Sequence, residues 1–169
     1  MWAGGNNAGN STDNGDDGTG ASGENQSAEK VLYSFEGKLS GKNALSEIQK
    51  QVPEEASLDS EIMENLPAFW YCKNYGENFG MRGELKNGWY LPGIRELYLV
   101  YENLSAVTAA LSLCNGSPVC ENVSGFYYSS SQDISPQKVY KLNFLSGRIS
   151  SGLKTTSTSS YVLAVREFE

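Results

Sequence analysis

The stretch GWYLPGIRELYLVY, residues 88–101, constrains the fold more than any other part of the sequence, because it marks an abrupt change from extended chain to helix. Pro92 keeps Leu91 extended, and its fixed φ angle and missing N–H suit the first turn of a helix. The apolar positions that follow recur with helical spacing and leave charged residues on the other side. We therefore expect Trp89 and Leu91 to anchor the start of this helix to the core, although an aromatic pair in front of a helix can also form a binding platform.

Helical spacing of apolar residues dominates the first half of the chain after the N-terminal tail. One extended segment precedes the helices, at residues 31–37, where apolar and polar residues alternate. The segments with helical spacing are residues 42–52, residues 62–75 with a regular start near Pro67, residues 94–104 and residues 105–113.

Alternation with a period of two, typical of half-buried strands, dominates the second half. The segments are residues 125–132, 138–144, 148–153 and 159–168, and a Leu-Ser-Gly turn links the two central ones into a hairpin. The last segment places Tyr161, Leu163 and Val165 on one face and Val162, Ala164 and Arg166 on the other. Helices first and antiparallel strands last indicate an α+β fold.

The first 30 residues consist mainly of Gly, Asn, Ser, Thr and Asp and have almost nothing to bury. We expect residues 1–30 to be a disordered tether and residues 31–169 to form a single domain. A tether of this kind can hold a domain away from a surface. We therefore expect an exported, cell-surface protein whose signal or lipid anchor is not part of this chain.

The net charge of -7 and the absence of a basic patch exclude nucleic acid and anionic membranes as expected partners. No run of 18 apolar residues is present, so we expect membrane contact only through a removed lipid anchor or signal.

Histidine is absent, which removes Ser-His-Asp and Cys-His catalytic sites and histidine-based zinc sites. The three cysteines contain no Cys-x-x-Cys pair, and we expect no metal and no cofactor. Cys114 and Cys120 flank the turn-like insert NGSPV and are candidates for a disulfide in an exported protein. The alternative is that these two and Cys72 are small buried hydrophobic residues.

Five segments in order carry a family resemblance: PAFWYCKNYG, NGWYLPGIRELYLVY, FYYSSSQ, VYKLNFLSGRI and YVLAVREF. Together they resemble the Lcl C-terminal domain family of bacterial collagen-like adhesins, and they are similar to spirochaete surface lipoproteins and to the variable proteins of diversity-generating retroelements. The resemblance covers residues 66–169 and implies a C-type lectin-like fold, shared with formylglycine-generating enzymes. Tyr90 and Tyr127 stand where the family pattern often has Arg and Trp.

The resemblance implies structural roles for the residues that match its motifs. These residues are Trp89, Leu91, Pro92, Glu96, Leu97, Ser129, Ser130, Ser131, Val165 and Arg166. Arg166 lies among apolar residues and needs an acidic partner, for which we predict Glu96 because both belong to matched elements. The alternative for Glu96 is a solvated position on a helix.

The resemblance also implies a ligand face on the late strands and loops, which here are rich in hydroxyls, amides and tyrosines. We expect a non-enzymatic, adhesin-like domain that binds a protein or glycan on another surface, with a diversified retroelement variable protein as one form of it. The candidate contact residues are Gln132, Asp133, Gln137, Lys138, Tyr140, Arg148, Ser150, Lys154, Thr156 and Thr158. At each of them an ordinary polar sheet surface is the alternative.

Two other functions remain open from the sequence. A structural surface protein without a specific ligand has the same sequence features. An oxidase related to formylglycine-generating enzymes would need paired copper-binding cysteines, but Cys114 and Cys120 lie outside the matched segments, so we do not expect catalysis. The Glu-Pro-Asn and Trp-Asn-Asp calcium signatures of lectins are absent, so calcium-dependent sugar binding has no sequence support.

Overall fold

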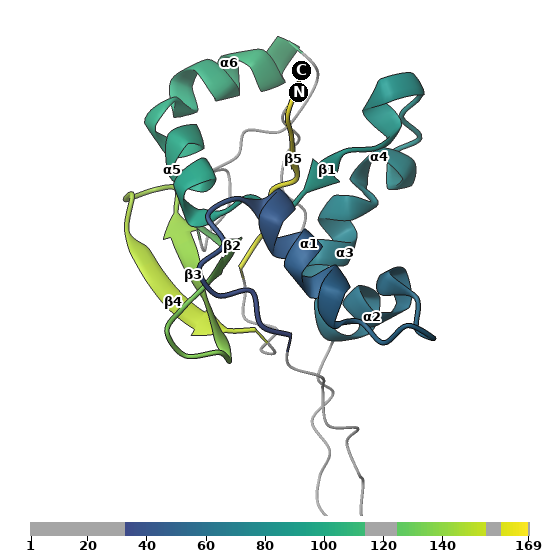
Figure 1. The fold of residues 1–169 in the computed structure, drawn as a ribbon. Coiled ribbons are helices and arrows are strands. Elements are labelled where there is room, and N and C mark those ends of the chain that lie inside the picture. The colour runs from purple at the N-terminus through teal and green to yellow at the C-terminus, as the bar shows by residue number, and fades with distance from the viewer. Residues whose placement is uncertain (1–32, 114–124, 155–159, 169) are drawn as a thin grey trace, which may run out of the picture.

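The computed structural model describes residues 33–113, 125–154 and 160–168, and within them the helices precede every strand except the two-residue β1, close to the predicted order (Figure 1). The helices are α1 (Gly41–Gln51), α2 (Leu58–Asn65), α3 (Pro67–Lys73), α4 (Tyr75–Asn78), α5 (Ile94–Glu102) and α6 (Leu104–Leu113), with a 3₁₀ turn at Gly83–Lys86. The strands are β1 (Trp89–Tyr90), β2 (Phe126–Gln132), β3 (Lys138–Asn143), β4 (Ile149–Leu153) and β5 (Val165–Arg166). The protein is therefore α+β, with small antiparallel sheets.

The strands β2, β3 and β4 form one antiparallel sheet in that order, and β1 pairs with β5 in a separate two-stranded ribbon. In the larger sheet Tyr127 lies opposite Leu142, and the register of β2 against β3 shifts between Tyr128 and Gln132. Such a shift changes the direction of the side chains beyond it. Figure 1 shows α1 to α4 on one side of the ribbon and α5, α6 and the larger sheet on the other.

Two hydrophobic clusters form the core, and the β1–β5 ribbon runs between them. The first cluster joins α1, α2 and α3, whereas the second joins α5, α6 and the larger sheet. Adjacent strand residues point to opposite sides, so Trp89 enters the first cluster and Tyr90 enters the second. The closing segment alternates in the same way, with Val162 and Ala164 in the first cluster and Leu163 and Val165 in the second. Trp89 and Tyr90, the aromatic pair before α5, therefore each pack into a different hydrophobic cluster of the core.

Local sequence rules account for the starts of the helices. Ser40 caps α1, because its side-chain oxygen accepts a hydrogen bond from the Asn43 N–H at 3.3 Å. Pro67 opens α3, as predicted from its fit to a first turn. The helix α5 begins at Ile94, two residues after Pro92.

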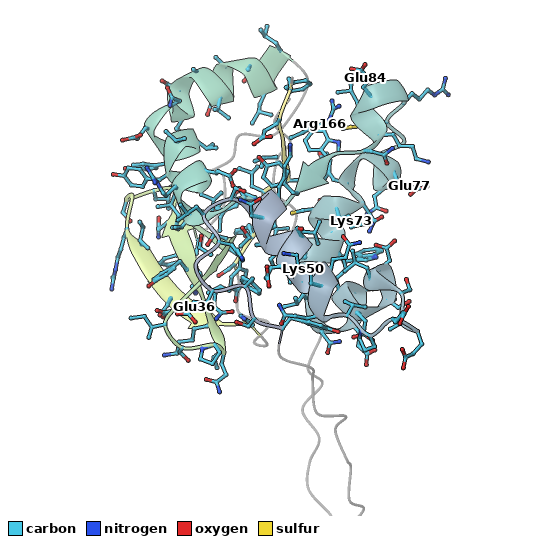
Figure 2. All side chains as sticks on the ribbon, in the orientation of Figure 1. Glu36, Lys50, Lys73, Glu77, Glu84 and Arg166 are labelled. Atoms are coloured by element: carbon cyan, nitrogen blue, oxygen red, sulfur yellow. The ribbon has the colours of Figure 1, made fainter. Side chains whose placement is uncertain are left out.

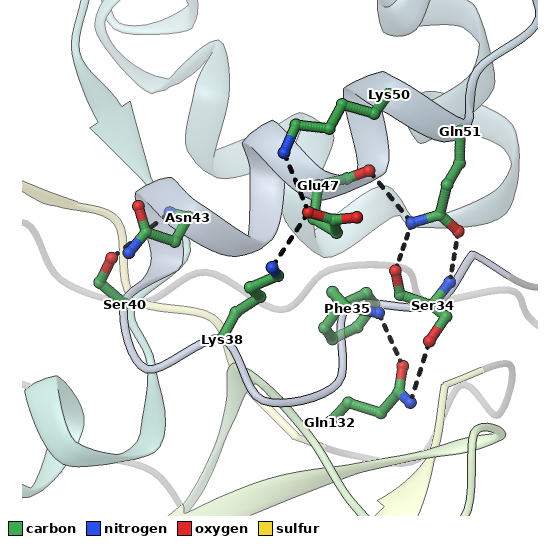
Figure 3. Close-up of polar contacts among 9 residues, drawn as sticks. All are labelled: Ser34, Phe35, Lys38, Ser40, Asn43, Glu47, Lys50, Gln51 and Gln132. Carbon is green, nitrogen blue, oxygen red and sulfur yellow. Dashed lines mark hydrogen bonds and ion pairs between the residues drawn. The ribbon is translucent and has the colours of Figure 1, made fainter.

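The strand predicted at residues 31–37 is wrong for residues 33–36, although buried and exposed residues alternate there as predicted. The backbone finds side-chain acceptors in place of a neighbouring strand (Figure 3). The Ser34 N–H donates to Gln51 Oε1 at 2.9 Å, and the Phe35 N–H donates to Gln132 Oε1 at 3.0 Å. Because these acceptors come from α1 and β2, the segment lies between them as an extended arm without sheet pairing.

Two further boundaries differ from the sequence patterns. The helical stretch expected from residue 62 begins at Leu58 and is interrupted at Leu66, where φ is -136° and ψ is 62°. A residue before proline is pushed out of the helical region, which explains the break. The strand expected at residues 159–168 is reduced to β5 and an isolated bridge between Tyr127 and Tyr161.

Figure 2 labels Lys73 on α3 and Glu77 on α4, and both charges have partners: Lys73 lies 2.6 Å from Asp59 and Glu77 lies 3.3 Å from Lys86. Within the described parts of the chain, no helix combines the length and the apolar character needed to cross a membrane bilayer. The expected tether at residues 1–30 and the candidate disulfide between Cys114 and Cys120 lie outside the described residues, so they stay predictions.

Candidate functional site

Four polar residues gather where β2 turns into β3, and we call them the Tyr140 cluster: Asp133, Lys138, Tyr140 and Ser151. Backbone bonds hold the turn, with the Asp133 N–H donating to the Lys138 carbonyl at 3.0 Å. Tyr140 lies directly opposite Ser151 in the β3–β4 pairing, so their side chains share one face of the sheet. All four residues are at least partly exposed to solvent. Three of them were predicted as contact residues, and Ser151 joins them through the hairpin register.

The carboxylate of Asp133 organises the cluster. The Ile134 N–H donates to Asp133 Oδ1 at 2.7 Å. This bond, together with hydrogen bonds from Ser151 and Tyr140 and the charge of Lys138, holds the pKa of Asp133 below its usual value. The hydrogen bond from the Tyr140 hydroxyl to Asp133, together with the negative charge of that carboxylate, raises the pKa of Tyr140. At neutral pH the cluster therefore presents a carboxylate that accepts hydrogen bonds and a neutral phenol that donates one.

This arrangement suits hydrogen bonding to a polar ligand. A phenol ring, an ammonium group, a carboxylate and a hydroxyl lie together at the surface, and tyrosine and serine are adaptable contact residues. Among the residues that the structure describes, no group of three or more His, Cys, Asp or Glu side chains is placed to hold a metal ion. The cluster can offer a ligand hydrogen bonds, two opposite charges and the face of one aromatic ring.

Two predicted contact residues, Gln132 and Lys154, point into the protein. Gln132 is 8% exposed, and its amide oxygen accepts a hydrogen bond from the Phe35 N–H (Figure 3). The Lys154 ammonium donates to the same amide oxygen at 2.8 Å and to the Tyr33 carbonyl at 2.8 Å. These bonds fasten the N-terminal arm to the sheet, so neither side chain belongs to the exposed contact surface.

The Lys154 ammonium is partly buried without a carboxylate partner among the described residues. Its nitrogen lies 4.0 Å from the centroid of the Phe35 ring. Burial lowers the pKa of Lys154 from its usual 10.5 to about 8. The charged form therefore depends on two neutral oxygens and one aromatic ring.

The other predicted contact residues divide between the two faces of the sheet. Gln137 lies in the exposed turn beside the Tyr140 cluster, and its side chain accepts a hydrogen bond from the Ser135 hydroxyl at 3.0 Å. Arg148 is exposed just before β4. Ser150 pairs with Lys141 and precedes Ser151, so it faces away from Tyr140. Thr156 and Thr158 lie outside the described residues.

An aromatic–lysine group on this opposite face was missed in the sequence. The Lys141 nitrogen lies 5.0 Å from the centroid of the Phe126 ring and 5.7 Å from that of Tyr128, within the range of cation–π attraction. Gly152 on the neighbouring strand leaves room for it, because a Cβ added there would lie 3.1 Å from Lys141 Cε. Strand alternation combined with the register of the Leu-Ser-Gly hairpin is the signal that predicts this group.

The serine run of β2 ties the sheet to the start of α5. The bonds run from the Ile94 N–H to Ser131 Oγ at 2.9 Å, from the Ser130 N–H to the Pro92 carbonyl at 2.8 Å and from Ser129 Oγ to the Tyr140 carbonyl at 2.8 Å. Trp89 and Leu91 are each 2% exposed, and the Trp89 indole donates to the Leu85 carbonyl at 2.7 Å. These residues therefore position the sheet and α5 relative to the core.

Glu96 forms no ion pair with Arg166, so the predicted pairing is wrong. Glu96 Oε2 accepts hydrogen bonds from the Gly93 N–H at 2.6 Å and from the Gly41 N–H at 3.1 Å. Its other oxygen accepts from the Tyr90 hydroxyl at 3.2 Å. The third position of a helix offers a carboxylate free backbone N–H groups and the positive end of the helix dipole, which explains why Glu96 turns there.

Arg166 packs through its side chain rather than through an ion pair. Its Nε lies 3.2 Å from the position of a Cβ added to Gly88, where φ is 86°, so this position favours glycine. The guanidinium carbon lies 5.1 Å from the centroid of the Phe168 ring. Its Nη1 is buried without a hydrogen-bond partner, a deficit that the stacked ring only partly offsets.

A hollow of about 440 Å³ lies between α1 and the α3–α4 pair. Its charged lining residues are already paired, with Lys73 2.6 Å from Asp59 and Lys86 3.3 Å from Glu77. A charged ligand would have to compete with these ion pairs, as it would with the bonds that Asp133 makes in the Tyr140 cluster. The Tyr140 cluster is the better candidate site because three of its four residues lie in the segment that the sequence predicts as the contact surface.

Comparison of the chain with protein-family models, curated proteins and solved structures finds no match.

Proposed function

We propose that this protein is a non-enzymatic ligand-binding domain of the C-type lectin-like type, displayed on a cell surface. The contact surface is the Tyr140 cluster with the adjoining turn that carries Gln137. The observation that carries the proposal is the contrast among the predicted contact residues. Gln132 and Lys154 turn inward and hold the N-terminal arm, whereas the side chains of the Tyr140 cluster bond to one another at the surface and stay accessible to solvent.

The distribution of apolar and polar side chains, and the burial of Cys72, support a binding role rather than a catalytic one. Each helix from α1 to α6 contributes buried apolar residues to one of the two core clusters, and polar residues of the late strands remain exposed. Cys72, the cysteine that the structure describes, is fully buried, and desolvation raises the pKa of its thiol. A buried, protonated thiol is a poor nucleophile and a poor metal ligand, so it gives no support to an oxidase.

The chemistry of the cluster favours a ligand with several hydrogen-bonding groups and one flat apolar face, which a sugar ring or a polar peptide loop provides. The test is a binding screen of the wild-type chain against immobilised glycans and surface proteins. The combined variant Lys138→Ala, Tyr140→Ala and Ser151→Ala should weaken binding of any hit by about tenfold or more, equivalent to roughly 1.4 kcal/mol. Substitutions at exposed positions leave stability within about 0.5 kcal/mol each, so the melting temperature should change little.

The matched control carries three exposed alanine substitutions on the helical half, at Lys50, Glu64 and Arg82. This control should bind as the wild type does. Equal loss of binding in the control, or unchanged binding in the triple cluster variant, would place the contact surface elsewhere. Unfolding of the cluster variant would contradict the exposed, non-structural role of these side chains.

A further inference from the structure

The outer face of α5 borders an apolar groove that none of the described residues covers. The groove has a volume of about 330 Å³ and is lined by Ile94, Arg95, Tyr98, Leu99, Glu102 and Ile149. Three of its large apolar side chains are well exposed: Tyr98 at 38%, Leu99 at 59% and Ile149 at 46%. Scattered exposed apolar residues are ordinary, but a contiguous group around a groove indicates a contact surface.

The charges of the groove are arranged along the same helix stripe. Arg95, Tyr98, Leu99 and Glu102 are spaced by three, one and three residues, so they share one face of α5. Arg95 and Glu102 stand at the two ends of this stripe, roughly 10 Å apart at the helical rise per residue. Neither side chain forms a hydrogen bond or an ion pair with another described residue. The stripe therefore has a cation, an apolar centre and an anion, in that order, and neither charge is paired within the described parts of the chain.

Such a stripe is complementary to itself in the antiparallel direction. A two-fold axis passing between Tyr98 and Leu99 would place Arg95 of each chain beside Glu102 of the other, and it would stack the two apolar centres. A two-fold contact uses the same patch on both subunits, which is the symmetry that this pattern satisfies. We propose that the groove along α5 is a dimer interface occupied by a second copy of this chain.

The expected dimer is weak and depends on concentration, because one short helix and one strand residue form a small contact. The first measurement is sedimentation equilibrium of the wild-type chain from roughly 1 µM to roughly 1 mM, a range that covers weak interfaces of this size. The average mass should rise from the 18.4 kDa of one chain toward twice that value. A chain that stays monomeric throughout, or that forms trimers or open polymers, overturns the proposal.

Charge exchange provides the specific test of the geometry. Arg95→Glu and Glu102→Arg should each raise the dissociation constant of the dimer at least tenfold. Each change puts like charges opposite each other at both of the symmetry-related contacts between residues 95 and 102. An equimolar mixture of the two single variants should dimerise, since every contact then joins opposite charges. The double variant Arg95→Glu and Glu102→Arg keeps the net charge of -7 and should restore the homodimer.

Matched controls separate the contact from a change in overall charge. Arg82→Glu and Glu64→Arg change the net charge by the same amounts at exposed positions away from α5, and they should leave dimerisation unchanged. Circular dichroism confirms the fold of each variant. The antiparallel pairing is overturned if either single α5 variant dimerises as strongly as the wild type. It is also overturned if neither the mixture nor the double variant assembles.

Discussion

Removing the carboxylate of Glu96 should destabilise the protein more than any other single exchange of a partly exposed charged residue. Its Oε2 accepts the N–H groups of Gly41 and Gly93, which begin α1 and α5, and both glycines are buried. Glu96→Ala leaves two backbone donors without an acceptor, and each costs about 1–3 kcal/mol. Loss of the Tyr90 bond and of the helix-dipole interaction adds to this cost, so the expected loss is about 3–5 kcal/mol.

Glu96→Gln separates acceptor geometry from charge. The amide keeps one oxygen for the two N–H groups, and its NH2 group can donate to the Tyr90 hydroxyl, so the expected loss is only about 1 kcal/mol. The free energy of unfolding is measured by urea denaturation, with the exposed Glu64→Ala as control, for which we expect a change within about 0.5 kcal/mol. A loss for Glu96→Ala no larger than the control would refute the capping role. Equal losses for the alanine and glutamine variants would mean that the charge, rather than the acceptor position, stabilises the fold.

Two more predictions follow from single positions. Gly41→Ala should displace α1 and lower the melting temperature, because the added Cβ would lie 1.8 Å from the Leu91 carbonyl oxygen; an unchanged melting temperature would refute this close approach. Burial lowers the pKa of Lys154 to about 8, so between about pH 8 and 10.5 the unfolded chain binds more protons than the folded chain, and folding stability from this group rises with pH. The unfolding free energy of the wild type should therefore increase over that range relative to Lys154→Met in urea titrations, whereas parallel curves would show that the ammonium is fully solvated.

Several elements could be predicted closely from the sequence, because their signals are local. The helix expected at residues 42–52 is α1 at Gly41–Gln51, and the hairpin expected at residues 138–144 and 148–153 is β3 and β4. A repeat of apolar residues with a period of 3.6 or 2 reports which side of an element is buried, whatever it packs against. The same rule correctly divided the closing segment, since Val162 and Leu163 enter different core clusters.

The candidate site could be predicted only in part. Asp133, Lys138 and Tyr140 lie together as expected near one turn, but Gln132 and Lys154 turn inward to hold the N-terminal arm. Composition indicates that a segment is polar. It does not predict whether a side-chain amide such as that of Gln132 faces solvent or accepts a hydrogen bond from the backbone of a distant segment. For Gln132 the deciding partner is Phe35, which lies 97 residues away in the sequence.

The sequence by itself determined the order of helices and strands, the helix start after Pro92 and the hairpin near the C-terminus, because these depend on dihedral preferences and periodic burial within a few residues. Only the tertiary structure determined which distant side chain accepts a hydrogen bond from a given backbone N–H group. The sequence predicted Arg166 as the partner of Glu96, but Glu96 binds the N–H groups of Gly41 and Gly93, since the folded chain brings two helix starts to one carboxylate. Residues 33–36 alternate like a strand, yet side chains of α1 and β2 satisfy their backbone, so they remain outside the sheet. Hydrogen bonds at these places are chosen by three-dimensional proximity, which a pattern along one chain does not encode.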